Sequence, residues 1–217
     1  LIDVKGKPMI QVVVDNLNIK AKYTFIVQKE HYEKYSLQYL LNLIAPDCNI
    51  VQVDGITEGA ACTTLLAKEF IDNDEPLLMA NSDQFVEWDS NETLYAFSNG
   101  DCDGGILTFP ASHPKWSYAK LDDDGFVSEV AEKKPISEHA TVGVYWWKKG
   151  SDYVKYAEQM IEKNIRTNGE FYVCPVFNEA IEDDKRVRIK EIDKDGMWGI
   201  GTPEDLNYFL KNYEGDI

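Results

Sequence analysis

Short apolar runs alternate with longer amphipathic segments through the first 83 residues of the chain. Residues 23–28 and 49–53 are rich in β-branched and aromatic side chains, which favours strands. The run at 77–80 is apolar at every position, as is typical of a strand that is buried on both faces. Helices are predicted before and between these strands, over residues 8–17, 30–44 and 60–68. This alternation at short spacing predicts parallel strands joined by right-handed crossovers.

The pattern changes after residue 100, where strands follow one another more closely. Residues 116–121 and 126–130 flank an Asp-Asp-Asp-Gly sequence at 122–125, which is a strong hairpin signal. Further strands are predicted at 104–109, 141–147 and 187–192. Helices are predicted at about 150–163, at about 174–183, and from Thr202 onward, with Pro203 at the first helical position.

The length and composition limit the kind of protein that this chain can be. With 217 residues and no internal repeat or linker, we expect one domain spanning 1–217. No apolar stretch approaches the roughly 20 residues that a membrane-spanning helix needs, and the first residues lack a signal-peptide pattern. A net charge of -16 argues against nucleic acid or an anionic membrane as a partner, because both attract basic surfaces. A small anionic substrate stays compatible with this charge, provided that lysines, backbone N–H groups and a metal surround it.

The cysteines and histidines show no metal-site spacing. The four cysteines are scattered, with no Cys-x-x-Cys pair, and we expect reduced thiols in a cytoplasmic protein. The three histidines form no His-x-His or His-Glu-x-x-His pattern, so a structural zinc site is not expected. These residues are Cys48, Cys62, Cys102, Cys174, His31, His113 and His139.

Asp83 follows the apolar run at 77–80 within a short polar segment. Open α/β sheets bind ligands beyond the carboxyl ends of their strands, which is where this carboxylate is expected. A carboxylate at that place can hold a hard cation such as Mg²⁺ against phosphate oxygens. The alternative is that Asp83 caps the next helix, and the segment alone leaves both interpretations open.

Two other segments carry residues with candidate chemistry. The loop Glu58-Gly59-Ala60 joins a predicted strand to a predicted helix, and its glycine lets a flat base approach the backbone. The segment 129–135 ends a strand, and a lysine beside a carboxylate there can hold a phosphate while the acid binds hydroxyl groups. The alternatives are a turn glycine in the first segment and a solvated charged turn in the second.

A polar and aromatic loop at 168–172 precedes a predicted helix. Glu170 is a candidate for binding hydroxyl groups, and Tyr172 is a candidate lining residue, although a capping loop with core aromatics explains them equally. Four aromatic residues suit the stacking of a sugar ring, and they suit the core of a hairpin as well. They are Trp116, Tyr118, Tyr145 and Trp146.

The order of these segments resembles the nucleotidyltransferases that activate sugar phosphates. The resemblance covers nearly the whole chain and is closest to single-domain members, including cytidylyltransferase-like proteins of capsule and surface-glycan pathways. It implies a Rossmann-like, three-layer α/β/α sandwich with a mixed, mainly parallel sheet, as in type A glycosyltransferases. The segments that carry it are 1–8, 58–61, 77–83, 129–135, 143–145 and 198–206.

The resemblance assigns nucleotide binding to two of these segments. It implies that Glu58, Gly59 and Ala60 form the loop that contacts the nucleobase. It also implies that Asp83 binds the nucleotide together with its Mg²⁺ ion, as a catalytic residue and the first metal ligand.

The resemblance assigns binding of the second substrate, the acceptor, to other residues. Glu132 and Lys133 match a Glu-Lys pair that contacts the acceptor's polar groups and its phosphate, which makes Lys133 a catalytic residue. Gly143 matches a glycine that lies close to the acceptor, and Glu170 lies where a further acceptor contact is expected. Tyr118 is the aromatic residue that we expect against the acceptor.

Two departures from the family pattern accompany the resemblance. The glycine-rich phosphate loop, with its arginine and a following lysine, is not present ahead of Leu1, and we expect it to lie outside the present chain. Gly199 stands where members commonly carry an aspartate that serves as the second metal ligand. Three alternatives follow from the missing aspartate. Asp83 holds the metal together with substrate phosphates and water, Asp89 assists Asp83, or the metal is bound in another way.

The implied reaction joins a nucleoside triphosphate (CTP, UTP or dTTP) to a phosphorylated sugar or another small phosphate ester, with release of pyrophosphate. Because the two substrates repel each other, a cation and a lysine are needed to bring them together. A glycosyltransferase of the same fold is one alternative, although the strand ends in Asn-Ser-Asp-Gln rather than Asp-x-Asp. A non-catalytic nucleotide-binding relative is the other alternative, since the phosphate loop and the aspartate at Gly199 are both missing.

Overall fold

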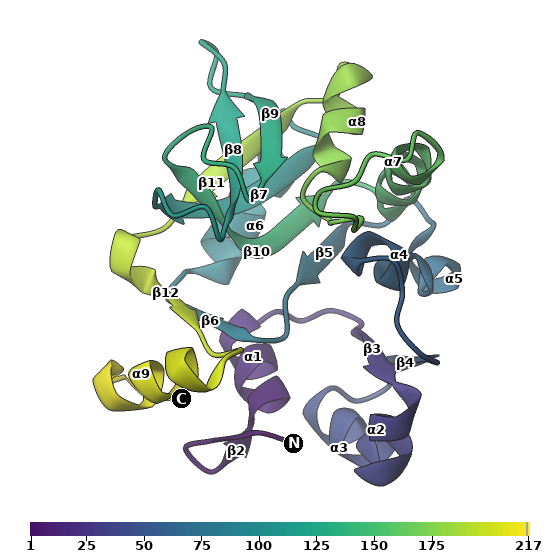
Figure 1. Cartoon of the computed structure of the whole chain (residues 1–217), viewed down its shortest axis with the longest axis vertical. Helices are drawn as coiled ribbons and strands as arrows, with labels where there is room; N and C mark the ends of the chain where they lie inside the picture. The colour runs from purple at the N-terminus through teal and green to yellow at the C-terminus, as the bar shows by residue number, and fades with distance from the viewer. Residues whose placement is uncertain (216) are drawn as a thin grey trace.

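A central mixed sheet is formed mainly by the apolar strands of the second half of the chain. The strands of this sheet are β5 (Leu77–Ala80), β7 (Gly104–Pro110), β8 (Ser117–Leu121), β9 (Val127–Glu132), β10 (His139–Trp147) and β11 (Val187–Glu191). A computed structural model describes residues 1–215 and 217 (Figure 1). The hydrogen-bonded order is β11-β7-β10-β8-β9, and β5 pairs with β10 beside this path. Strand β10 is antiparallel to β5, β7 and β8, whereas β11 is parallel to β7.

The alternating pattern of the first half is only partly reflected in the pairing of its strands. Strands β3 (Thr24–Gln28) and β4 (Asn49–Val53) pair in parallel, as predicted, in a two-stranded sheet of their own. Strand β5 does not join them but pairs with β10 in the antiparallel sense. The α/β class with a mixed sheet is confirmed, whereas the expected predominance of parallel pairs is corrected. The reason is that the hairpin of β8 and β9 covers only the first part of one β10 edge, which leaves the rest of that edge to β5.

Two neighbouring glycines at the start of β7 reveal helices on both faces of the sheet. A Cβ added at Gly104 would come within 2.7 Å of the Phe177 ring, and one at Gly105 within 2.6 Å of the Phe97 ring. Successive side chains of a strand point to opposite faces, so these two rings cover opposite faces. Phe177 belongs to α8 (Val176–Glu182) and Phe97 to α6 (Ser90–Asn99). The expected three-layer α/β/α arrangement is therefore confirmed.

The other helices complete these layers and cover the β3–β4 sheet. Helix α7 packs against α8, while the first three helices share a cluster of buried apolar side chains with β3 and β4. The helices are α1 (Met9–Leu17), α2 (Lys29–Lys34), α3 (Leu37–Ile44), α4 (Ala60–Leu65), α5 (Lys68–Ile71), α7 (Gly150–Glu162) and α9 (Pro203–Asn212). In the described part of the chain, none of the helices has the length and apolar character needed to cross a membrane.

Several element boundaries differ from the sequence-based expectation. The predicted helix at 30–44 is divided into α2 and α3, because Ser36 adopts a left-handed conformation with φ 49°. The predicted helix at 60–68 ends at Leu65, and a separate turn of helix follows. Four short strands and a 3₁₀ turn were not predicted, because runs of two or three residues carry no periodicity. They are β1 (Asp3–Val4), β2 (Lys7–Pro8), β6 (Gln84–Val86), β12 (Met197–Gly199) and the turn Lys194–Gly196.

Trp147 is the central side chain of the largest buried cluster. Its indole stacks on Phe177 with 4.3 Å between ring centroids and 6° between planes. Tyr153 and Tyr156 of α7 lie against the same indole. This stack joins the last residue of β10 to both α7 and α8, so it fixes one helical layer on the sheet.

We expect Trp147→Ala to lower the free energy of unfolding by about 3–5 kcal/mol, because it removes a fully buried aromatic side chain and leaves a cavity. Urea denaturation followed by circular dichroism measures this loss. Tyr39→Ala is the control, since Tyr39 is 73% exposed and its removal should change the stability by less than about 0.5 kcal/mol. Equal losses in the two variants would contradict the central role of the stack.

Candidate functional site

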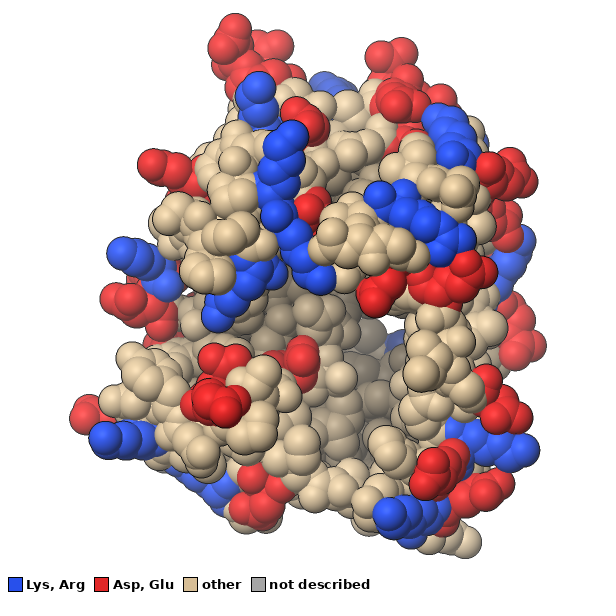
Figure 2. All heavy atoms as spheres, in the orientation of Figure 1, with Lys and Arg blue, Asp and Glu red and all other residues tan. Residues whose placement is uncertain are grey.

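A deep hollow lies at the centre of the face shown in Figure 2, between β5, α1 and β3. Lysine and arginine side chains gather above it, and aspartate and glutamate side chains gather below it and to its right. Strand β5 ends at Ala80, and the polar segment that follows leads into β6. The hollow is therefore bordered by charges of both signs, which suits an anionic ligand that is bound together with a cation.

Asp83 lies in a bend between β5 and β6 and has an exposed side chain. No helix begins at Asp83, and Asp89 is the residue that caps α6, so the helix-capping alternative for Asp83 does not apply. The main chain of Asp83 is fixed, because its carbonyl oxygen accepts a hydrogen bond of 2.9 Å from the Ile200 N–H. Gly201 lies directly against the carboxylate, where an added Cβ would overlap it. Desolvation raises the pKa of the Asp83 carboxyl, and the negative charge of Asp205 adds to this effect.

A divalent cation would find hard oxygen donors at this place. The Asp83 carboxylate has the chemistry that Mg²⁺ prefers, and glycine at position 201 allows the carboxylate to lie directly against the backbone. Within residues 1–215 and 217 there is no group of three or more Asp, Glu, His or Cys side chains that could enclose a metal ion. Mg²⁺ commonly keeps several waters and binds through one or two carboxylates plus substrate phosphates. The residues present therefore suit that mode of binding and not a closed protein cage.

Gly143 occupies an irregular part of β10, beside the segment that contains Asp83. The register between β10 and β7 shifts between Thr141 and Tyr145, and Gly143 has φ 79°. An added Cβ at Gly143 would overlap the Asn81 amide and lie 2.8 Å from the Gln84 Oε1 atom. Only glycine suits this conformation and this close approach. The backbone of β10 therefore lies directly against two polar side chains.

Gln84 carries a buried donor without a partner. The side chain is only 4% exposed, and its Nε2 atom forms no hydrogen bond among the described residues. An unpaired buried amide costs free energy, so its presence needs an explanation in a native structure. A ligand oxygen that enters beside Gly143 would satisfy it. Gln84 is therefore a candidate binding residue that the sequence did not single out.

Glu132 lies at the end of β9 and is held by a buried polar network. Its carboxylate accepts a hydrogen bond from the Ser117 hydroxyl, and the Tyr145 hydroxyl lies 2.9 Å from Thr141 Oγ1 in the same region. Desolvation raises the pKa of the Glu132 carboxyl, while Ser117 and the charge of Lys133 act against this shift. The carboxylate is thus half-buried and held in one orientation, as is needed to accept hydrogen bonds from a ligand's hydroxyl groups.

Lys133 is oriented both by its backbone and by Tyr172. It adopts a left-handed conformation with φ 55°, and its N–H donates a hydrogen bond of 3.0 Å to the Trp116 carbonyl. Its Nζ atom donates to the Tyr172 hydroxyl over 2.5 Å and lies 4.6 Å from the centre of that ring. The hydrogen bond to Tyr172 raises the pKa of Lys133, and the charges of Glu132 and Glu170 also contribute. Lys133, Glu132 and Glu170 are thus close enough to interact electrostatically.

The Glu58-Gly59-Ala60 loop is joined to the segment that contains Glu170. The Phe171 N–H donates to the Glu58 carbonyl over 2.9 Å, and the Ala61 N–H donates to the Phe171 carbonyl over 3.0 Å. Gly59 has φ 135°, and an added Cβ would overlap the Phe171 backbone. Arg166 reinforces this contact, because its guanidinium pairs with Glu58 at 2.5 Å and lies 3.9 Å from the centre of the Phe171 ring. The two loops therefore form one unit.

The expectation that Tyr118 contacts a ligand is corrected by the structure. Its side chain is fully buried, and its hydroxyl donates a hydrogen bond of 2.6 Å to the His113 carbonyl. Tyr145 and Trp146 are buried as well, while Trp116 packs edge-on against Phe109. The Tyr118 ring therefore points into the core, where a ligand cannot stack on it.

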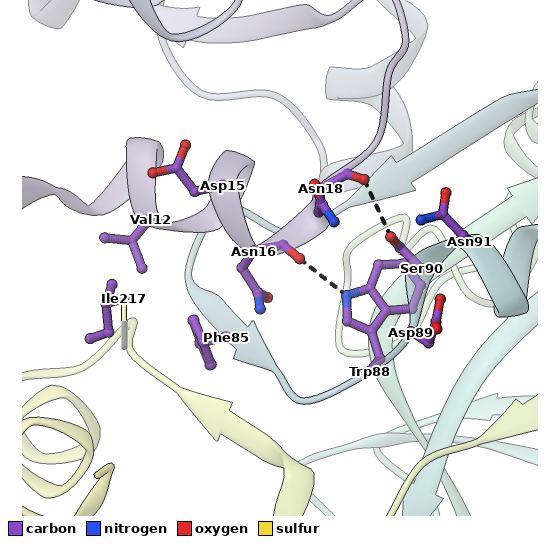
Figure 3. Close-up of a pocket in the computed structure, with 10 residues that line it drawn as sticks. All are labelled: Val12, Asp15, Asn16, Asn18, Phe85, Trp88, Asp89, Ser90, Asn91 and Ile217. Atoms are coloured by element: carbon purple, nitrogen blue, oxygen red, sulfur yellow. Dashed lines mark hydrogen bonds between the residues drawn. The ribbon is translucent and has the colours of Figure 1, made fainter. Parts of the chain in front are cut away.

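A cavity of about 440 Å³ lies apart from these residues, between α1, β6 and the start of α6 (Figure 3). The Trp88 indole N–H donates to the Asn16 carbonyl across it, and the Ser90 hydroxyl donates to the Asn18 carbonyl. The Asp89 carboxylate lines this cavity and accepts the capping hydrogen bond from the Glu92 N–H. Asp89 is therefore engaged as a helix cap.

Most of the residues predicted from the sequence form two connected groups. One contains Glu58, Gly59, Ala60, Glu170, Lys133 and Glu132, connected through Phe171 and Tyr172. The other contains Gly143 and the segment that carries Asp83. Sequence reasoning did not single out Asn81, Gln84, Ser117, Arg166 and Asp205. Of these residues, only Asn81 and Gln84 could have been found from the sequence, because they lie in the same short polar segment as Asp83.

Comparison with known proteins gives one family and several similar folds. The family model described as Nucleotidyl transferase matches residues 1–214. A nucleoside-diphosphate-sugar pyrophosphorylase from Vibrio cholerae RC9 is 20% identical, with a TM-score of 0.81 over 97% of this chain and 90% of that chain. A UDP-glucose pyrophosphorylase complexed with UDP-glucose is 16% identical, with a TM-score of 0.72 over 98% and 88%. The inositol-1-phosphate CTP transferase from T. maritima is 13% identical, with a TM-score of 0.69 over 99% and 88%. No curated protein matches the chain.

We expect Gly59→Ala to separate the two loops, because an added Cβ overlaps the Phe171 backbone. Hydrogen exchange at the Phe171 and Ala61 amides should become at least about 10-fold faster, since both hydrogen bonds depend on that contact. Gly125→Ala is the matched control: Gly125 also has a positive φ, of 79°, but no atom lies within 4 Å of an added Cβ. Unchanged exchange in Gly59→Ala would show that the loops are not joined through this glycine.

Proposed function

This chain belongs to the nucleotidyl transferase family, and from that premise we propose that it joins a nucleoside triphosphate to a small phosphorylated acceptor. The match of the family model over residues 1–214 is the observation that carries the proposal. We propose CTP, UTP or dTTP as the nucleotide and a phosphorylated sugar or a similar phosphate ester as the acceptor. The whole chain would act as one nucleotidyltransferase domain. A cytoplasmic location and a role in capsule or surface-glycan synthesis are part of this hypothesis, and the four free cysteines are compatible with a reducing compartment.

In the proposed reaction, an acceptor phosphate oxygen attacks the α-phosphorus of the nucleotide. The new oxygen–phosphorus bond forms as the bond to the β-phosphate oxygen breaks, and pyrophosphate leaves with that electron pair. Little covalent work remains for the protein, which has to align two anions and offset their repulsion. Basic and acidic side chains around one hollow support this interpretation.

Asp83 is the residue that we assign to the metal. A bound Mg²⁺ would supply positive charge that stabilises the phosphate oxygens during transfer. The exposure of Asp83 supports this assignment, because an ion and its phosphate ligands can reach the carboxylate. The Ile200 N–H keeps the backbone of Asp83 in place.

Lys133 and Glu132 are the residues that we assign to the acceptor. Lys133 would hold the acceptor phosphate, with Tyr172 orienting the ammonium group before the substrate arrives. Glu132, held by Ser117, would accept hydrogen bonds from hydroxyl groups of the acceptor. Gly143 would allow the acceptor close to the β10 backbone, and Glu170 would add a further polar contact.

The Glu58-Gly59-Ala60 loop is the part of the site that we assign to the nucleobase. Glycine at position 59 leaves the backbone accessible to a flat ring, and the contact with Phe171 fixes the loop. Because the same segment carries Glu170, binding of the base and binding of the acceptor would depend on one structural unit.

We expect Asp83→Asn and Lys133→Met each to lower kcat/KM for pyrophosphate release at least about 100-fold, because each removes a charge that acts on the transferring phosphates. The assay uses the full-length protein, Mg²⁺ and each triphosphate with a panel of sugar phosphates and other phosphate esters. Lys134→Met removes an exposed charge from the next residue and should keep the activity within about twofold.

Full activity in Asp83→Asn would remove the metal assignment. Nucleotide binding in calorimetry without any turnover would favour the non-catalytic relative. Transfer from a nucleotide sugar without pyrophosphate release would favour the glycosyltransferase.

We expect Gln84→Met to raise the KM for the acceptor about 10-fold, because an acceptor oxygen would lose the hydrogen bond from Nε2. The KM for the nucleotide should stay the same. The free energy of unfolding should be unchanged or higher, since the variant removes a buried donor that has no partner. Steady-state kinetics and urea denaturation measure the two effects. A loss of stability with unchanged KM values would assign Gln84 to the fold alone.

A further inference from the structure

Asp205 lies beside the metal position proposed for Asp83. We infer that Asp205 supplies the second carboxylate to the cation that Asp83 binds, an inference that rests on the proposed function. Asp205 is in the first turn of α9, four residues after Gly201. It was not among the candidates predicted from the sequence, which noted glycine in place of an aspartate at Gly199 and offered Asp89 as the acid that assists Asp83.

The space beside Gly199 is bordered by the Asp205 carboxylate. A Cβ built at Gly199 would lie 3.6 Å from both Cγ and Oδ2 of Asp205, which is an ordinary van der Waals contact. The side chain from the helix therefore reaches the place where a side chain on β12 would begin. Gly201, two residues further along, lies more closely against the Asp83 carboxylate, where an added Cβ would overlap it. The two carboxylates thus border one short stretch of backbone that has no side chains at either glycine.

The backbone holds these two acids in a fixed relation. Strand β12 pairs with β6, so that Gly199 lies opposite Gln84, the residue after Asp83. The hydrogen bond from the Ile200 N–H to the Asp83 carbonyl continues this pairing. Because Thr202 caps α9 directly after Gly201, the first turn of the helix is tied to the same strand.

The two negative charges are not offset by any lysine or arginine of the described residues. Within residues 1–215 and 217, no lysine or arginine pairs with either carboxylate, and the only hydrogen bond to the Asp205 side chain comes from the Thr202 hydroxyl, over 2.9 Å. Two carboxylates that border one short stretch of backbone, neither of them paired with a described lysine or arginine, are a donor set that a hard divalent ion stabilises.

A purely structural role for Asp205 is the competing explanation. Its N–H donates to Thr202 Oγ1 over 3.1 Å, and the Thr202 hydroxyl donates back to its carboxylate, which is a reciprocal cap of α9. Substitution by asparagine separates the two roles. An asparagine Oδ1 atom can still accept the hydrogen bond from Thr202, whereas the negative charge is lost.

Binding of MnCl₂ alone to the full-length protein, measured by water-proton relaxation and by calorimetry, tests the inference. We expect Asp205→Asn to weaken the affinity for Mn²⁺ about 10-fold or more. Glu204→Gln is the matched control, because it removes an exposed charge from the same helical turn and should leave the affinity unchanged. Thr202→Val breaks the cap but keeps the charge of Asp205, and it should retain most of the Mn²⁺ binding.

Each outcome separates this inference from the proposed function. Equal weakening in Asp205→Asn and Glu204→Gln would reduce the effect to general charge and overturn the inference, as would loss of Mn²⁺ binding in Asp83→Asn but not in Asp205→Asn. An absence of Mn²⁺ binding by the unaltered protein would overturn it as well. The proposed function is tested separately by pyrophosphate release, so a protein that binds Mn²⁺ through both acids without turnover would retain the inference and lose the function.

Discussion

The irregular register of β10 at Gly143 is the constraint on which the arrangement of the site depends. Before this glycine β10 pairs with β8, and after it the same edge pairs with β5. Where the neighbour of β10 changes from β8 to β5, the side chains of Asn81 and Gln84 approach the backbone of β10. Any larger residue at position 143 would overlap these amides, so the close approach, the positive φ and the change of partner belong together.

The candidate site has to bind anions although the whole chain carries a large negative net charge. A chain of net charge -16 repels anionic substrates at long range, so affinity for a phosphate has to come from oriented groups at short range. Lys133 is held by Tyr172, Glu132 by Ser117, and Glu58 by Arg166. These contacts fix the direction of each charged group before a ligand binds, which lowers the cost of ordering them.

The features that the sequence predicted correctly are those with a local physical signal. The strand at 77–80, the acidic hairpin turn and the Thr-Pro start of the last helix all lie where they were expected, because period, turn chemistry and capping act over a few neighbouring residues. The strand at 77–80 is not buried on both faces as expected, since its first three residues are half-buried and Ala80 is exposed. The errors have a different cause. The hairpin pattern around Tyr118 was equally compatible with a core and with a binding face, and only the packing of the neighbouring strands decided for the core.

The sequence by itself determined the α/β class, the family and the segments that carry chemistry, because strand ends, glycine loops and acid–lysine pairs are visible as residue types in order. Only the tertiary structure decided which strands pair, that β5 joins β10 in the antiparallel sense, and that the loops at Gly59 and Phe171 form one unit. It also brought Asp205 to Gly199 and left Gln84 Nε2 without a partner. These relations join residues that lie far apart in the chain or on different elements, and no local pattern records the distance between their side chains.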